Sequence, residues 1–342
     1  MNIFYPPYLA ELIIADLDMF RVFNPPVYQG NRRLKRYFEG WYFKQVTADE
    51  KKVFSFIPGI SLTPDDPHSF IQFIDGITGE TRYVRYDHGD FRYSGNSFKV
   101  WVGNSFFSRS KMILNINEKD FKVKGEINYS LSAGFPSSFF SPGIMGWYSF
   151  VPFMECKHGV VSMNQFANGR IRINQEYTDF KNGKSYIEKD WGTSFPSAWI
   201  WLQSNNFDNP QVSVMLSVAK IPWLGSFFMG FLAFFYLEGK TYLFTTYNNS
   251  KFELKDYDDN FIFIDLRKKD LLLSIKIERR KSGELMAPDK GKMSRMIKES
   301  VDSVVDLTLK NNDGKTIFSG KGRRAGMEVT SNIFELIKNG IK

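Results

Sequence analysis

Residues 186–207 decide the fold, and they read Tyr186-Ile-Glu-Lys-Asp-Trp-Gly-Thr-Ser-Phe-Pro-Ser-Ala-Trp-Ile-Trp-Leu-Gln-Ser-Asn-Asn-Phe207. Two short runs, 186–191 and 198–205, flank a turn that contains glycine and proline. Short runs rich in aromatic and β-branched residues and bounded by Gly and Pro are typical of β-strands. The stretch therefore predicts two consecutive strands that carry acids, a lysine, tryptophans and amides.

The whole chain has the composition of a β-rich protein. Its 342 residues suggest two domains, and 17% of them are aromatic, including 34 Phe and 16 Tyr. Aromatic side chains favour the pleated, half-buried surfaces of strands. Ring-rich runs bounded by turn residues recur along the chain, as in antiparallel sandwiches and barrels. The predicted strands are 38–46, 53–57, 70–74, 81–86, 98–102, 112–116, 170–177, 184–189, 198–205, 212–219, 231–237, 241–246, 261–267, 271–278, 304–309 and 316–319.

We divide the chain into three segments. Residues 1–36 form a lead-in, in which the apolar positions between Tyr8 and Phe20 recur with helical spacing and predict a short amphipathic helix. Residues 37–182 form a first β domain. Residues 183–342 form a second β domain, which ends in a short helix over residues 332–338.

Charge and cysteine content exclude several classes of protein. The net charge is +8, but the basic clusters lie in no known nucleic-acid-binding signature, so we expect no nucleic-acid partner. The single cysteine, Cys156, excludes a disulfide within the chain, and the three histidines lack metal-ligand spacing, so we expect no metal. The N-terminus lacks a signal-peptide pattern, which predicts a cytoplasmic protein.

Two stretches, 127–154 and 221–237, contain no acidic, basic or histidine residue. Prolines and glycines argue against a spanning helix in the first, and the second is shorter than the about 20 residues that a span needs. Buried strands with apolar loops are the simpler interpretation of both. The apolar loop from Phe135 to Phe153 is expected to rim a hydrophobic mouth or to touch a lipid interface, which predicts a peripheral membrane contact.

The first strand of the opening stretch carries candidate catalytic acids. Glu188 and Asp190 share one face of a strand, and Lys189 points to the other. Neighbouring carboxylates repel, so one of them resists ionisation and can serve as a general acid. A solvated strand end with ordinary ion pairs is the alternative. Glu39 lies between aromatic residues, and there a buried carboxylate is costly unless it is paired or protonated.

The second strand carries candidate ligand-binding residues. Alternate residues of this strand share one face, which carries two indoles followed by two amides, at Trp199, Trp201, Gln203 and Asn205. If this face lines the interior of a barrel, the mixture of apolar surface and a few amides is typical of a small-molecule site. Packing in a core is the alternative. In the strand over 38–46, Tyr42 and Lys44 share a face, and Glu39, Trp41 and Phe43 share the opposite one.

Four segments resemble the tocopherol cyclase family and occur in the family's order. They are 37–44 (Tyr-Phe-Glu-Gly-Trp-Tyr-Phe-Lys), 103–106, 185–205 and 285–288 (Leu-Met-Ala-Pro). The first and third are the most specific of the four. Together they span most of residues 37–309, and the chain is identified by them as a member of this family.

The resemblance implies an all-β fold of two lipocalin-like half-barrels, similar in pattern to carotenoid hydratases, and chemistry that needs no organic cofactor. Such an enzyme closes a chroman ring on a prenylated benzoquinol, because an acid protonates the prenyl alkene and the quinol hydroxyl attacks the cation. The candidate acids are Glu188, Asp190 and Glu39. The candidate substrate-binding residues are Trp41, Tyr42, Lys44, Lys189, Trp191, Trp199, Trp201, Gln203 and Asn205.

Asp190 departs from the plant and cyanobacterial pattern, in which an asparagine stands at this position. An acid there supplies a further proton donor or indicates another reaction. Three other functions therefore stay open: a hydratase-like isoprenoid enzyme, a non-catalytic carrier of a lipid or quinone, and a peripheral membrane protein without a small ligand.

Overall fold

The computed structural model describes residues 21–30, 35–152, 154–223, 225–330 and 332–340. Nearly all regular structure in them is β-strand, in two antiparallel sheets, so the all-β prediction is confirmed. The predicted helix over residues 8–20 lies outside the described residues. The predicted C-terminal helix is present as α2 (Ile333–Gly340). No helix among the described residues is long and apolar enough to cross a bilayer.

The first sheet contains 12 strands of the described chain, in the order β4-β3-β2-β1-β12-β10-β9-β8-β7-β6-β5, with β11 paired to β10. Their bounds are β1 (Tyr37–Val46), β2 (Val53–Leu62), β3 (His68–Asp75), β4 (Thr81–Asp87), β5 (Phe91–Tyr93), β6 (Lys99–Val102), β7 (Ser105–Ser108), β8 (Lys111–Asn117), β9 (Lys122–Ala133), β10 (Cys156–Ile173), β11 (Glu176–Asp179) and β12 (Gly183–Gly192). Short 3-10 turns occur at η1 (His88–Asp90) and η2 (Gly146–Phe150).

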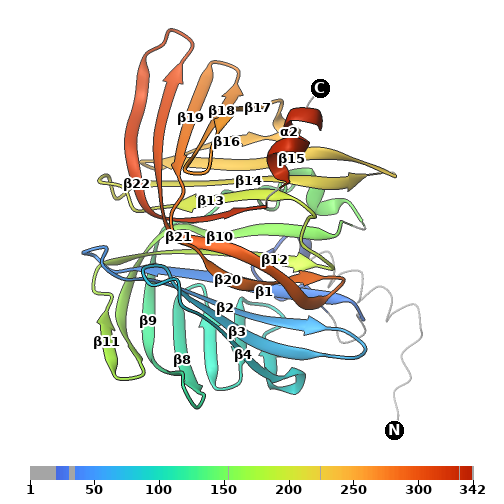
Figure 1. Cartoon of the computed structure of the whole chain (residues 1–342), viewed down its shortest axis with the longest axis vertical. Helices are drawn as coiled ribbons and strands as arrows, with labels where there is room; N and C mark the ends of the chain where they lie inside the picture. Colours follow the sequence, from blue (N-terminus) through green and yellow to red (C-terminus); the bar gives the residue numbers. More distant parts are fainter. Residues whose placement is uncertain (1–20, 31–34, 153, 224, 331, 341–342) are drawn as a thin grey trace.

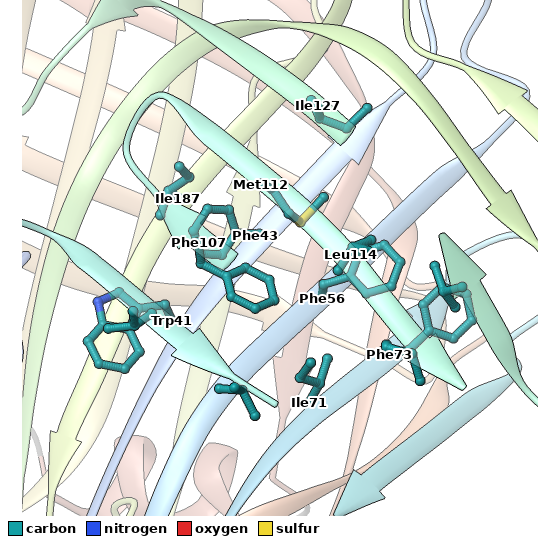
Figure 2. Close-up of a cluster of buried hydrophobic side chains, with 14 of the residues drawn as sticks. Trp41, Phe43, Phe56, Ile71, Phe73, Phe107, Met112, Leu114, Ile127 and Ile187 are labelled. Atoms are coloured by element: carbon teal, nitrogen blue, oxygen red, sulfur yellow. The ribbon is translucent and has the colours of Figure 1, made fainter. Parts of the chain in front are cut away.

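An aromatic core explains why the first sheet curls (Figure 2). Trp41 and Phe43 of β1 pack against Phe98 and Phe107, with ring centroids 5.8 Å and 5.4 Å apart respectively. Phe107 lies on β7, which is distant from β1 in the strand order. The sheet must bend for these rings to meet, and burial of each large apolar side chain contributes about 1.5–3 kcal/mol.

The second sheet contains 10 strands of the described chain, in the order β16-β15-β14-β13-β22-β21-β19-β18-β17, with β20 paired to β21. Their bounds are β13 (Trp199–Ser204), β14 (Val212–Trp223), β15 (Ser226–Leu237), β16 (Lys240–Thr245), β17 (Lys251–Tyr257), β18 (Phe261–Lys268), β19 (Leu271–Glu278), β20 (Gly283–Asp289), β21 (Lys292–Asn311) and β22 (Thr316–Val329), with η3 (Thr246–Asn248) after β16. Phe231 of β15 and Phe252 of β17 have centroids 5.8 Å apart, so this sheet also curls.

The two sheets stack with their outer faces together, the first below the second in Figure 1. Buried side chains at this interface include Tyr42 and Tyr186 from the first sheet and Trp201 from the second. The hairpin of β20 and β21 reaches across to the first sheet. There, the Gln72 side chain donates to the Met286 carbonyl at 2.9 Å and accepts from the Met286 amide at 2.7 Å.

Strand β12 belongs to the first sheet, and the predicted domain boundary after residue 182 falls immediately before this strand. It pairs with β1 from Phe38↔Gly192 to Val46↔Lys184, and with β10 on its other side. The first sheet therefore extends to Gly192, and the second begins at Trp199. The pairing of β12 with β1 joins segments far apart in the chain, so local patterns do not reveal it.

Candidate active site

A cavity of about 1300 Å³, including the space at its opening to solvent, lies between the two sheets. Its lining is mostly apolar and aromatic, with a few acids. We expected a ligand-binding face inside a barrel. Each sheet instead fills its inner side with its own hydrophobic core, and the ligand-sized space lies between the outer faces.

Strand alternation places the side chains of β12 as the sequence predicts. Glu188 and Asp190 line the cavity, whereas Lys189 lies on the other face, with its Nζ 5.1 Å from the centroid of the Trp41 ring. On β1, Tyr42 lines the cavity, and Trp41 belongs to the core of the first sheet. The two central strands of the first sheet thus present one face to the cavity and the other to the core.

His158 on β10 completes the first-sheet side of the site, and the sequence analysis did not nominate it. It is the cross-strand partner of Asp190, and its Nδ1 lies 2.9 Å from Asp190 Oδ1. Its Nε2 lies 3.5 Å from Glu188 Oε2 and has no hydrogen-bond partner among the described residues. Since the pairing of β10 with β12 creates this cluster, no local spacing could have indicated it.

The second sheet contributes two further acids that the sequence analysis missed. Glu299 of β21 and Glu328 of β22 are cross-strand partners, and both line the cavity. The Tyr42 hydroxyl donates to Glu299 Oε1 at 2.6 Å, and Trp199 Nε1 donates to Glu328 Oε2 at 2.6 Å. Both acids lie outside the strands predicted for this region, 304–309 and 316–319, because β21 and β22 are longer than the sequence pattern indicates.

Burial disfavours ionisation of three glutamates of this cavity, Glu188, Glu299 and Glu328. It raises the pKa of Glu188 to about 7, with the nearby His158 opposing the shift. It raises the pKa of Glu299 to about 8, and that of Glu328 well above its ordinary value, with Glu299 adding to the latter shift. Charges so close together in an apolar cavity cannot all form, so protonated carboxyls persist near neutral pH.

His158 carries the compensating positive charge. Burial alone would lower its pKa, but the carboxylates of Asp190 and Glu188 outweigh burial and raise the pKa to about 9. The ring is therefore protonated at neutral pH and pairs with Asp190. One ligand atom from each of these three residues lies within 4.8 Å of the others, so the cluster could also hold a metal ion. In the present arrangement His158 Nδ1 is already bonded to Asp190.

Glu39 is not brought to the cavity, although the sequence analysis made it the third candidate acid. It is fully buried on the opposite face of β1, where its Oε1 lies 2.6 Å from Lys189 Nζ. Its carboxylate also accepts hydrogen bonds from the backbone amides of Gln29 and Gly30. Lys189 in turn donates to two carbonyls of segment 25–30. The pair therefore holds this segment against the first sheet.

The candidate substrate-binding residues divide into three groups. Tyr42, Trp199 and Trp201 line the cavity. Lys44, Gln203 and Asn205 are buried between the sheets but lie outside the cavity lining. Trp41, Lys189 and Trp191 face the core of the first sheet or its edge.

Sequence comparison relates the chain to one family and, over a short stretch, to two plant proteins. Residues 126–331 match the family model described as tocopherol cyclase-like. Over 74 residues the chain is 35% identical to the probable chloroplastic tocopherol cyclase of Oryza sativa subsp. japonica and to the chloroplastic tocopherol cyclase of Zea mays. Each alignment covers 22% of this chain and 16% of the plant protein.

Solved structures share the fold at low sequence identity. CghA superposes with a TM-score of 0.56 and 10% identity, over 86% of this chain and 88% of that chain. An AttH-like protein of Nitrosomonas europaea has a TM-score of 0.50 and 16% identity, over 89% of this chain and 95% of that chain. These likenesses extend to both halves of the chain and show the architecture of two lipocalin-like β domains.

Proposed function

Because this chain belongs to the tocopherol cyclase-like family, we propose that it protonates the alkene of a prenylated quinol and closes an oxygen ring on the resulting cation. The observation that carries this proposal is the set of carboxyls with raised pKa inside an apolar, tryptophan-lined cavity. Protonation of an alkene needs a strong donor that stays protonated near neutral pH, together with surroundings that exclude water.

Glu188 is the proton donor of the proposed reaction. Its proton moves to the less substituted alkene carbon, so a C–H bond forms, the π bond breaks and a tertiary cation remains. The quinol oxygen attacks the cation, and the hydroxyl proton returns to the Glu188 carboxylate. The product is an isomer of the substrate, and the enzyme returns to its starting state without a co-reactant.

Aromatic rings at the site stabilise the cation. Trp199, Trp201 and Tyr42 line the cavity near the acids. A cation over an indole face gains about 2 kcal/mol or more when water is excluded. Since this attraction is absent for the neutral alkene, it acts mainly on the cationic transition state and accelerates the reaction.

In the proposed reaction His158 orients the quinol oxygen, and the acids of the second sheet stay protonated beside Glu188. The protonated His158 has a free Nε2–H, which donates to a quinol oxygen, while Asp190 fixes the ring through Nδ1. Glu299 and Glu328 retain protons near Glu188, mainly because burial raises the pKa of both, and a negative Glu188 adds to the shift. An asparagine at position 190 could accept the same hydrogen bond, so the departure from the plant pattern is compatible with this role.

Anaerobic incubation of the purified protein with a phytylated benzoquinol tests the proposal. Chromatography with mass spectrometry should detect a product of unchanged mass with a shifted retention time and chroman absorbance. The matched quinone, which lacks the nucleophilic hydroxyl, should give no such product. A product heavier by one water would instead identify a hydratase, and recovery of unchanged bound quinol would identify a carrier.

A further inference from the structure

Exposed aromatic side chains lie next to residues that line the cavity. We call this group the aromatic rim, and its members are Phe139, Phe140, Trp147, Phe150, Trp223 and Phe227. Phe140 and Phe139 are 79% and 70% exposed, the highest values among the large apolar side chains of the described residues. Exposed apolar groups that cluster in this way mark an interaction site rather than an ordinary surface.

Ring contacts make the rim continuous with the cavity lining. Tyr148 and Phe228 line the cavity, and their centroids are 6.3 Å apart. Trp147 stacks on Tyr148 at 4.1 Å, and Trp223 contacts Phe228 at 6.3 Å. The exposed rim and the apolar interior therefore form one uninterrupted path.

A second group of rings extends the rim along the loop between β9 and β10. Phe139 contacts Phe140 at 5.3 Å and stacks on Phe23 at 5.2 Å. Phe23 also contacts Phe150, with the centroids 5.8 Å apart. These ring contacts hold the loop in place while Phe139 and Phe140 remain exposed to solvent.

The charge pattern around the rim suits an anionic lipid surface. The two stretches that supply the rim, 127–154 and 221–237, contain no charged residue, so insertion would bury no charge. Lys157 and Lys220 flank them, and Lys220 Nζ lies 4.4 Å from the centroid of the Phe227 ring. Three acids also flank the stretches, namely Glu155 and, farther along the chain from the rim residues, Glu126 and Glu238. The chain as a whole has a net charge of +8.

We propose that the aromatic rim docks the protein on an anionic phospholipid surface, from which the substrate's prenyl tail enters the cavity. Tryptophan and phenylalanine favour the lipid–water interface, and flanking lysines add attraction to anionic headgroups. The route of the tail rests on the proposed function, whereas docking itself requires no turnover. Vesicle binding therefore tests the rim independently of catalysis.

Flotation with vesicles of phosphatidylcholine and phosphatidylglycerol provides the first test. The wild-type protein should float with the vesicles, and more weakly when phosphatidylglycerol is left out. The variant Phe139→Ser/Phe140→Ser/Trp223→Ser should bind roughly tenfold or more weakly, because binding scales with the apolar area inserted. The control variant Tyr177→Ser/Ile317→Ser changes exposed apolar residues of β11 and β22, outside the rim, and should float like the wild type.

Quenching by lipids with brominated acyl chains provides the second readout. Tryptophan fluorescence should be quenched in the wild type and much less in Trp147→Phe/Trp223→Phe, which retains aromatic rings. Equal flotation of the wild type and the triple serine variant would overturn the proposal, as would a wild type that binds neither vesicle. Self-association of the wild type that is lost in the triple variant would make a second copy the partner, and would also overturn it.

Discussion

Replacement of Glu188 by glutamine should lower turnover of a phytylated quinol by about 10²–10⁴-fold, the usual contribution of a general acid. Glutamine keeps the size of the side chain and can still accept the hydrogen bond that the Tyr186 hydroxyl donates at 2.6 Å. It cannot deliver a proton to an alkene. The affinity for the substrate should change little, because the lost interaction acts in the transition state.

Turnover should depend on pH through the protonation state of Glu188. The pKa of Glu188 is raised to about 7, and the reaction needs the protonated form. Turnover by the wild type should therefore be highest below that pH and should fall as the pH rises through it. The residual turnover of Glu188→Gln should lack this fall, since the titrating donor is gone.

Matched variants separate the acid from its neighbours. Glu284→Gln changes an exposed carboxyl of β20 outside the cavity and should leave turnover unchanged. Glu299→Gln removes a neighbouring acid whose ionised form would disfavour ionisation of Glu188, so it should shift the pH profile more than it lowers the maximum rate. Wild-type turnover in Glu188→Gln would remove this residue from the role of donor.

Replacement of Lys189 by methionine should lower the free energy of unfolding by about 3–5 kcal/mol, because it leaves a buried carboxylate without its partner. Lys189 and Glu39 are fully buried and 2.6 Å apart. Burial already raises the pKa of Glu39 and lowers that of Lys189 to about 8, so desolvation opposes both charges. The midpoint of urea unfolding, monitored by tryptophan fluorescence, measures the loss.

Two control variants locate the cause of that loss. Glu39→Gln/Lys189→Met removes both charges and should recover part of the stability, because no unpaired charge remains. Arg170→Met breaks an exposed pair with Asp179 and should change the free energy of unfolding by less than about 1 kcal/mol. Should Lys189→Met unfold at the wild-type midpoint, the pair would not be holding segment 25–30 in the way described.

Alternation along single strands explains what the sequence could predict. Glu188 and Asp190 share the cavity face, Lys189 takes the other face, and Trp199 and Trp201 point into the same space from the second sheet. Successive side chains of a strand point to opposite faces, and this alternation determines these placements within each strand. The stretch 231–237 was expected to be a buried strand, and it lies within β15.

Strand pairing explains what the sequence could not predict. His158 reaches Asp190 only because β10 lies beside β12, and Glu299 reaches Glu328 only because β21 pairs with β22. The pattern of its own strand makes Glu39 a candidate acid, but its environment is set by Lys189 on the neighbouring β12. Partners that lie far apart in the chain decide which acids are paired and which remain protonated.

Deuterium incorporation tests the central claim, which is that a carboxyl of the cavity delivers a proton to the alkene carbon. The quinol would be incubated with the protein in D₂O, and the purified product would be returned to H₂O before mass spectrometry. The account predicts one non-exchangeable deuterium, on the ring carbon derived from the protonated alkene carbon, and far less product with Glu188→Gln. A cyclised product that contains no carbon-bound deuterium would contradict it.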